Sequence, residues 1–448
     1  MRIVRDDDTP SKFEFGPIKP ENVVTQAENA STVQHAPSVK TEPSLMEQAH
    51  APRLCYFGNL PVEASSAGPA QLYRVLHKYP EGRLQIFEVD CRPSAPELRI
   101  PKADYRRIMP LFERGWYFSR MKLPRLFWAL LEFESWRQVR LVEKTLMDFH
   151  PEAVLSIHEG IGWYTAAKLA RRLQVPLHLI MHDDWFRNIP MAPALKTKFE
   201  KVFGEIYRAA SSRFCISPYM EEEYARRFNA VGTVLYPIRS PKAVQHVAPP
   251  SESDVNSQGL KVAYAGNLWH KGNWESLRNL AAALETIGGQ LLIFGPTTAD
   301  DARRHGLNQA NVKVHGFVPD LIQSLRDEAH VVFVAMTFEE SERRNMEVCF
   351  PSKMTEYTAA GLPVLIQGPE YSSAVRWARE NQDAAEIVIQ QGREPLERSL
   401  QRLLNPEWRG KLGRRALELG NQCFSFENGT RILRSTLIAS HGRPIAWN

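Results

Sequence analysis

Short apolar runs, each ending in a small or polar residue and followed by a helical period, recur along the chain from residue 53 onward. In the first half these runs are RLCYFGN, RLQIFEVD, AVLSIHEG, PLHLIMHDDW, SRFCIS and GTVLYP. The second half repeats the pattern with LKVAYAGN, QLLIFGP, VKVHGF, HVVFVAM, LPVLIQGP and AAEIVI. Repeated strand, loop and helix units are typical of parallel α/β sheets buried on both faces. The sequence therefore predicts two doubly wound parallel sheets in tandem, with at least six strands in the first.

The domain boundaries follow from changes in composition along the 448 residues. The segment HVAPPSESDVNSQG, residues 246–259, is rich in Pro, Ser and Gly and predicts a linker between domains at 53–245 and 260–425. A closing helix and tail at 426–448 are expected to pack back on the first domain. Residues 1–52 lack hydrophobic periodicity and are acidic overall, which predicts a disordered tail.

Composition excludes several classes of protein. The formal net charge of +5 is too diffuse to indicate nucleic-acid binding. The five cysteines are far apart and form no C-x-x-C pair, so they indicate neither a disulfide scaffold nor a zinc site. The N-terminus has no apolar signal region, and no apolar run reaches the length of a spanning helix. These features lead us to expect a cytoplasmic protein.

The stretch FPSKMTEYTAAGLPVLIQGP, residues 350–369, predicts a short helix fixed at both ends. Pro351 suits a first helical turn, Gly361 suits a left-handed exit, and Pro363 stops the helix before the strand LPVLI. The first-turn amides form a candidate anion site at the positive end of the helix dipole. They are the amides of Ser352, Lys353 and Met354. Glu356 either hydrogen-bonds a ligand held there or merely complements the dipole.

A second informative stretch is VAYAGNLWHKGNWESLRNLAAAL, residues 262–284. Gly266 ends a strand, and Lys271 comes just before a helix expected to start near Asn273. The ammonium group of Lys271 is either available to a phosphate or simply solvated. The stretch contains neither G-x-x-x-x-G-K-[ST] nor G-x-G-x-x-G, so it excludes an NTPase P-loop and a dinucleotide fingerprint.

Four motifs occur in the order found in retaining glycosyltransferases of family 4: IMHDD, AGNLWHKG, HGFVP and PSKMTEYTAAGLPVLI. From about residue 53 to 440 the chain resembles that family, including the closing helix FSFENGTRILRSTLI. The resemblance implies a GT-B fold of two Rossmann-like domains facing a cleft. It implies a nucleotide-sugar donor in the second domain and a glycan or lipid-linked glycan acceptor in the first. It further implies a hexosyltransferase-like enzyme of polysaccharide biosynthesis that needs no metal or other cofactor.

The resemblance also assigns roles to residues at matching positions. Glu356 would hold the ribose hydroxyls, Lys271 would neutralise the donor diphosphate, and His182 would lie near the transferred sugar. Together with Glu347 these three residues make up the expected reaction centre. The expected donor-binding residues are Gly68, Gly266, Asn267, Gly295, Gly316, Phe317, Ser352, Lys353 and Met354. Within this set Gly316 and Phe317 would lie beside the nucleotide base.

Two positions depart from the family pattern. The glutamate that the family places eight residues before its ribose-binding glutamate is Val348 here, with Glu347 as the nearest substitute. The arginine that often follows the first glycine loop is Asn267. Arg343 or Arg344 is an alternative source of that charge, although the run EESERRNME that contains both is otherwise a solvated loop.

Basic and aromatic residues alternate between residues 102 and 128. The basic residues are Lys102, Arg106, Arg107, Arg114, Arg120, Lys122 and Arg125, and the aromatic ones are Tyr105, Trp116, Tyr117, Phe118, Phe127 and Trp128. Such a segment can dock on an anionic membrane surface, so we expect peripheral contact with the inner face of the membrane. Alternatively, the core face of a helix contains four apolar residues, which are Phe127, Trp128, Leu131 and Trp136.

The expected function is therefore a retaining, metal-independent transfer of a sugar from a nucleoside-diphosphate donor to a glycan or lipid-linked glycan. One alternative is a nucleotide-sugar epimerase on the same architecture, which would use water in place of an acceptor. Another is a nucleotide-sugar-binding partner of a glycan assembly complex that has lost its chemistry, a reading that Val348 keeps open.

Overall fold

The computed structural model describes residues 51–65, 67–89, 93–111, 124–185, 191–251, 259–268 and 271–447. The predicted disordered tail, residues 1–52, lies outside this part of the chain except for its last two residues. The described residues all belong to one compact unit.

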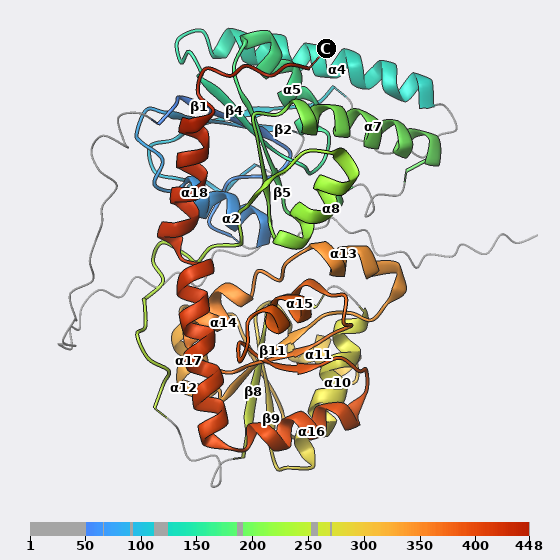
Figure 1. Ribbon diagram of the computed structural model, residues 1–448, viewed down its shortest axis with the longest axis vertical. Coiled ribbons are helices and arrows are strands. Elements are labelled where there is room, and N and C mark those ends of the chain that lie inside the picture. The colour runs from blue at the N-terminus through green and yellow to red at the C-terminus, as the bar shows by residue number, and fades with distance from the viewer. Residues whose placement is uncertain are drawn as a thin grey trace, which may run out of the picture. The chain divides into compact units, whose positions relative to one another are not determined.

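Seven parallel strands of the described residues form the sheet of the first half, in the order β3-β2-β1-β4-β5-β6-β7. Figure 1 labels β1, β2, β4 and β5 of this sheet. The strands are β1 (Leu54–Gly58), β2 (Leu84–Val89), β3 (Asp104–Ile108), β4 (Ala153–Ile157), β5 (Leu177–Met181), β6 (Ser212–Cys215) and β7 (Thr233–Val234). Every residue of β1, β2, β4 and β5 is buried. This burial on both faces explains the continuous apolar runs in the sequence.

Six parallel strands form the second sheet within the described residues, in the order β10-β9-β8-β11-β12-β13. They are β8 (Lys261–Ala265), β9 (Gln290–Phe294), β10 (Val312–Gly316), β11 (Val331–Ala335), β12 (Val364–Gln367) and β13 (Glu386–Val388). All six were predicted from the sequence. The prediction of two doubly wound parallel sheets is confirmed.

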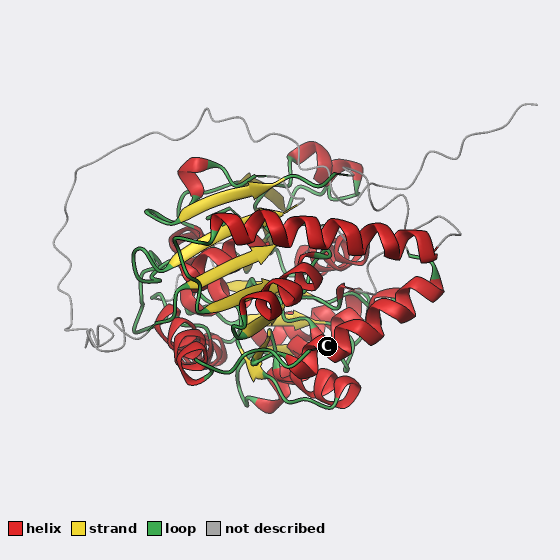
Figure 2. Cartoon of the chain, turned by 90° about the horizontal axis from the view of Figure 1, so that it is seen from above, coloured by secondary structure: helices red, strands yellow, loops and turns green. Residues whose placement is uncertain are grey.

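Helices cover both faces of the strands (Figure 2). In the first half they are α2 (Ala67–Leu76), η1 (Pro96–Leu98), α4 (Pro124–Thr145), α5 (Gly162–Leu173), α7 (Pro193–Ala209) and α8 (Pro218–Phe228). In the second half they are α10 (Lys271–Glu285), α11 (Ala299–Arg304), α12 (Leu321–Glu328), η2 (Glu340–Glu342), α13 (Arg343–Val348), α14 (Met354–Ala360), α15 (Ser373–Glu380), α16 (Arg393–Leu403), α17 (Pro406–Cys423) and α18 (Phe426–Ala439). Helix α18 belongs to the core of the first half, where Phe426, Leu433 and Leu437 are buried with Leu72 and Leu76 of α2.

Strand order reverses at one place in each sheet. Strand β1 lies between β2 and β4, and β8 lies between β9 and β11, so the crossovers diverge on either side of β1 and of β8. In open α/β sheets, ligands bind outside the carboxyl ends of the strands at such a switch point. The residues that follow β1, β4, β8 and β11 are therefore the first to consider as a site.

The basic segment differs from its prediction. Its described part contains β3, an edge strand absent from the predicted set, because the sequence DYRRI is charged and only Ile108 is buried. Lys102 lies 2.8 Å from Glu81, and Arg106 lies 3.1 Å from Asp104. Residues 112–123, with three of the seven basic and three of the six aromatic side chains of this segment, lie outside the described residues.

The alternative interpretation of this segment was that four apolar residues form the core face of a helix. It is right for three of them. Phe127 and Leu131 are buried, and Trp128 packs on Phe199 with ring centroids 5.2 Å apart. Trp136 does not belong to this core face, because 44% of it is exposed. Helix α4 thus buries one face and leaves apolar side chains on another.

Candidate functional site

Three glycines stand side by side at the carboxyl edge of the second sheet. Gly266, Gly295 and Gly316 follow or end β8, β9 and β10, and their φ angles are +123°, +116° and +74°. The amide of Gly266 donates to Phe294 O at 3.0 Å, and that of Gly295 donates to Gly316 O at 2.8 Å. These φ values lie in the region that side chains disfavour, so the edge presents backbone alone. The structure brings together all three predicted glycines.

An exposed aromatic residue adjoins this edge. Phe317 directly follows Gly316 and is 75% exposed. The preceding residue, His315, stacks on Phe294 with ring centroids 4.5 Å apart. An exposed ring beside bare backbone offers a stacking surface for a flat ligand group, and this is where the sequence placed the nucleotide base.

Helix α14 is shorter at its start than predicted. It begins at Met354, and the preceding residues form a turn in which the amide of Met354 donates to Pro351 O at 3.1 Å. The amide of Met354 is therefore already satisfied, and the prediction that it would be a free anion donor is wrong. Gly361 ends the helix with φ +68°, as predicted. The side chain of Ser352 is exposed at the start of this turn.

Glu356 on α14 connects the two halves of the chain. Its Oε1 accepts a hydrogen bond from Arg74 Nη2 of α2 at 2.8 Å, and its Oε2 accepts one from Thr355 Oγ1. Arg74 also donates from Nη1 to Ile238 O at 2.8 Å. The side chains of Arg74 and Glu356 are only 17% and 20% exposed. Arg74 therefore contacts Glu356, the residue predicted to bind the donor ribose. The sequence did not reveal this contact.

Two lysines lie near the switch point of the second sheet. Lys271 is the first residue of α10 and is exposed. The next amide, that of Gly272, donates to Glu339 Oε1 at 2.8 Å, so a carboxylate of the chain already complements this helix end. The second lysine, Lys353, reaches toward Gly266, where its Nζ would lie 3.9 Å from a Cβ placed on that glycine. Asn267, next to Gly266, accepts a hydrogen bond from Tyr264 Oη through its carbonyl at 2.9 Å.

The carboxyl edge of the first sheet carries titratable side chains instead. His182 follows β5, and its Nδ1 would lie 3.7 Å from a Cβ placed on Gly68. Burial lowers the pKa of His182 to about 4, so its ring is neutral at physiological pH. The structure thus places Gly68 and His182 side by side, although they are far apart in the sequence.

Glu159 was not among the predicted site residues. It follows β4 two residues after Ile157, which pairs with Ile180, so the register places it beside His182. Burial, and then the charge of Asp183, raise the pKa of Glu159 to about 7. The rule that ligands lie at strand ends could have found this residue, because AVLSIHEG ends there.

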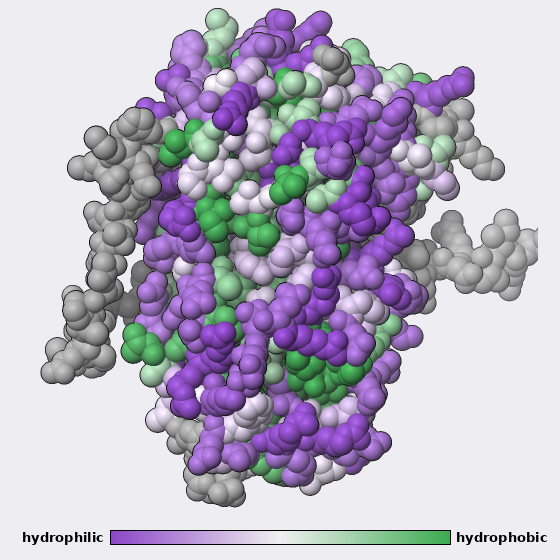
Figure 3. All heavy atoms as spheres, in the orientation of Figure 1, coloured by the Kyte–Doolittle hydropathy of each residue, from purple (hydrophilic) through white to green (hydrophobic). Residues whose placement is uncertain are grey.

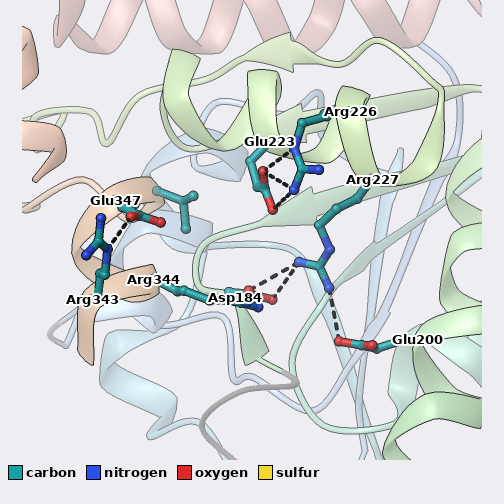
Figure 4. Close-up of a pocket in the computed structure, with 9 residues that line it drawn as sticks. Asp184, Glu200, Glu223, Arg226, Arg227, Arg343, Arg344 and Glu347 are labelled. Atoms are coloured by element: carbon teal, nitrogen blue, oxygen red, sulfur yellow. Dashed lines mark hydrogen bonds and ion pairs between the residues drawn. The ribbon is translucent and has the colours of Figure 1, made fainter. Parts of the chain in front are cut away.

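Charged side chains from both halves line a cavity of about 530 Å³. Its lining residues are Asp184, Glu200, Glu223, Arg226, Arg227, Arg343, Arg344, Glu347 and Val348. Figure 4 shows Arg227 between Asp184 and Glu200, at 3.2 and 3.1 Å.

Glu347 lies on α13 at this cavity and accepts from Arg343 Nε at 2.9 Å. The charged run that contains them is helical, so its prediction as a loop is wrong, because ion pairs one turn apart stabilise α13. Arg343 and Arg344, the suggested substitutes for a missing arginine, line this cavity too.

Neither a metal cluster nor a spanning segment occurs in the described part of the chain. No group of three or more His, Cys, Asp or Glu side chains there could hold a metal ion. No helix there combines the length and the apolarity needed to cross a bilayer.

Comparison with known proteins finds a family model that matches part of the second half of the chain. Residues 259–405, less than half of the chain, match the family model described as Glycosyl transferases group 1. No curated protein sequence matches. The matched segment contains all three edge glycines, Lys271, Lys353 and Glu356.

Solved structures similar to this chain are glycosyltransferases. Anabaena Alr3699/HepE, in complex with UDP and glucose, has a TM-score of 0.60 and 13% identity over 86% of this chain and 99% of its own. A glycosyltransferase from Rickettsia africae has a TM-score of 0.61 and 12% identity over 86% and 97%. The lipopolysaccharide outer core galactosyltransferase WaaB has a TM-score of 0.54 and 17% identity over 85% and 99%. At these identities the likeness shows the fold, which is that of GT-B glycosyltransferases.

Proposed function

We propose that this protein is a retaining, metal-independent glycosyltransferase of family 4, which moves a sugar from a nucleoside-diphosphate donor to a glycan or lipid-linked glycan. The observation that carries the proposal is the bare edge of three glycines beside Lys353, in the segment that matches the family model. A backbone edge at a switch point lets an extended, anionic ligand approach closely.

The residues around this edge divide the task of holding the donor. Phe317 would stack on the base, and Glu356 would accept hydrogen bonds from the ribose hydroxyls. Lys271 would lie against the diphosphate, where negative charge grows as the glycosyl bond breaks, and fixed cations aimed at that charge lower the barrier. We propose that ammonium groups do this without a metal ion. Because HepE was solved with UDP-glucose, UDP-hexoses are the first donors to test.

The acceptor would enter from the first half. His182 and Glu159 stand at its sheet edge, and the charged cavity next to α8 offers paired carboxylates and guanidinium groups to a hydroxyl-rich molecule. One neighbour is named as a lipopolysaccharide core galactosyltransferase, which supports a glycan acceptor on a lipid.

The proposed activity predicts donor-dependent release of nucleoside diphosphate that survives EDTA, measured with a glycolipid extract as acceptor. Lys271→Ala and Glu356→Ala should each lower the rate at least about a hundredfold, as loss of a fixed charge-stabilising group does. Lys411→Ala on α17, 53% exposed, is the matched control and should keep full activity.

Other outcomes select other functions. Unchanged rates in both site variants would refute the site assignment. Free sugar and nucleotide released without any acceptor would favour an epimerase, and tight donor binding without turnover would favour an inactive partner.

We further propose that the first half contacts an anionic membrane through the exposed face of α4. Leu126, Phe133 and Trp136 lie on one side of this helix at 49%, 60% and 44% exposure. Arg125 and Arg140 are exposed on the same helix and would meet lipid phosphates. On the face drawn in Figure 3, hydrophilic residues predominate and hydrophobic ones form separate groups.

Flotation with anionic vesicles tests the membrane contact. The protein should float at low salt. The double variant Phe133→Glu and Trp136→Glu should not float, because it lacks the two aromatic side chains that would insert into the membrane. Val247→Glu, at a position 92% exposed outside α4, is the control and should float normally. Equal recovery of all three proteins, or no flotation of the unaltered one, would exclude this contact.

A further inference from the structure

Among the described residues, the Tyr264 ring is the only partner of the Lys353 amino group. Its Nζ lies 3.9 Å from the centroid of the Tyr264 ring, and that ring is completely buried. From there it faces Gly266, whose missing side chain leaves Nζ 3.9 Å from the ideal Cβ position. The lysine therefore lies at the edge of the second sheet, directly beside the first of its three glycines.

No carboxylate forms an ion pair with Lys353 within the described residues. The acid nearest in sequence, Glu356, is held by Arg74 and Thr355. Burial lowers the pKa of Lys353 to about 7, because no opposite charge compensates for the loss of water. The amine thus titrates close to physiological pH, where a large share of the Lys353 side chains is neutral in the free protein.

We propose that the Lys353 side chain is a ligand of the donor's diphosphate and that it takes up a proton from solvent when the donor binds. This inference rests on the proposed function and adds a residue to its site. The Lys353 amine gains the proton as –NH3⁺, and the diphosphate, with its two esterified ends, keeps both negative charges. No bond to the donor forms or breaks in this step.

The other groups around Lys353 do not account for such a proton. Tyr264 on β8 faces it, and Tyr357 on α14 accepts a hydrogen bond from Ala265 N at 2.6 Å. Burial raises the pKa of both tyrosines, so both stay neutral near pH 7. Lys271 on α10 is exposed and Glu356 is ion-paired. If Lys353 only made a cation-π contact with Tyr264, adding the donor would not change its protonation.

Titration calorimetry in buffers of different ionisation enthalpy tests the proposal. The donor is whichever of UDP-glucose, GDP-mannose and ADP-glucose raises the melting temperature most, since a ligand that binds only the native state stabilises it. At pH 7.5 the unaltered protein should take up more than half a proton per donor bound. Its affinity should fall as pH rises above 7, because protonating the amine then becomes harder.

Variants separate a diphosphate ligand from a structural lysine. Lys353→Met keeps the packing on Tyr264 and should weaken donor binding about tenfold or more at pH 6.5 while abolishing proton uptake. Lys353→Arg should bind without proton uptake, because guanidinium stays charged. Lys411→Met is the control that should change neither quantity. Unchanged affinity and unchanged proton uptake in Lys353→Met would overturn the proposal.

Inorganic pyrophosphate makes this test independent of the donor. If no nucleotide sugar binds, the proposed function fails, and the role of Lys353 is decided by pyrophosphate affinity at pH 6.5. A tenfold loss in Lys353→Met, but not in Lys411→Met, supports a diphosphate site. Equal affinity in both variants, or no pyrophosphate binding at all, contradicts it.

Discussion

The two sheets share one strand order, yet their carboxyl edges are built from different chemistry. In the second half the edge is three glycines with positive φ and a partly buried lysine, Lys353. In the first half it carries the side chains of His182 and Glu159, with pKa values moved to about 4 and about 7 by burial. The same backbone scaffold thus presents backbone without side chains, together with lysines, on one side, and a neutral histidine and a glutamate on the other.

The difference indicates which ligand each half can take. Bare backbone with cations suits a ligand with an extended, constant anionic part, because backbone does not vary with sequence. Side chains at strand ends suit a ligand whose hydroxyl pattern must be distinguished, because each donor and acceptor can be placed separately. The residues 259–405 that match the family model contain the edge with the three glycines.

The two edges should differ most in how much stability the protein loses when a glycine at each edge is replaced by alanine. Gly295→Ala should lower the free energy of unfolding by about 2–3 kcal/mol, because a side chain at φ +116° is strained and its Cβ would lie 3.2 Å from Gly266 N. Gly68→Ala should change it by less than about 1 kcal/mol, since the nearest neighbour of the Cβ is the flexible end of Leu60 at 2.8 Å and His182 Nδ1 lies at an ordinary contact distance of 3.7 Å. Urea unfolding of both variants measures this. Equal losses would show that the two edges do not differ in backbone strain.

The sequence predicted the second edge better than the first because of what each is made of. Gly266, Gly295 and Gly316 end apolar runs, so the strand pattern placed them at the edge of the sheet, and the family resemblance assigned them to the donor. Glu159 also ends an apolar run, but a lone glutamate is usually solvated, and only register and burial show its raised pKa. The charged strand β3 was missed for a related reason, because an exposed edge strand lacks the buried pattern.

Contacts between distant residues were beyond any sequence pattern. Nothing in the sequence pairs Arg74 with Glu356, which are 282 residues apart. The position of the Lys353 side chain depends on the turn before α14, which also removed Met354 from the expected donors. Local signals therefore located the elements and the strand ends, whereas side-chain partners required the tertiary structure.

The two edges should respond in opposite ways to pH. The pKa of Glu159 is raised to about 7, so the native state holds a proton between pH 4.5 and 7 that the unfolded chain lacks, and stability falls as pH rises through that window. The pKa of Lys353 is lowered to about 7, so above pH 7 the unfolded chain holds the extra proton, and stability rises toward pH 10.5. Each effect should be on the order of 1–2 kcal/mol after allowance for partial exposure.

Urea unfolding between pH 5 and 9.5 separates these contributions. Glu159→Gln should flatten the decline between pH 5 and 7 and leave the alkaline limb unchanged. Lys353→Met should flatten the rise above pH 7 and leave the acid limb unchanged. If Glu159→Gln changes the alkaline limb instead, or Lys353→Met the acid limb, the assignment of these opposite pH effects to the two edges is wrong.

The smallest expected effect concerns the contact that joins the two regions. Arg74 and Glu356 are 2.8 Å apart and about one-fifth exposed, so their coupling should exceed that of a surface pair and reach about 1 kcal/mol. A double-mutant cycle with Arg74→Met and Glu356→Gln measures it as the departure from additivity. The exposed pair Arg398–Glu394 on α16, also at 2.8 Å, is the control and should couple less. Because donor ribose would compete for or share the same carboxylate, the coupling should change when the cycle is repeated with saturating donor. A coupling that stays constant would show that Glu356 does not bind the ribose. Its role would then be limited to the ion pair that connects the two halves.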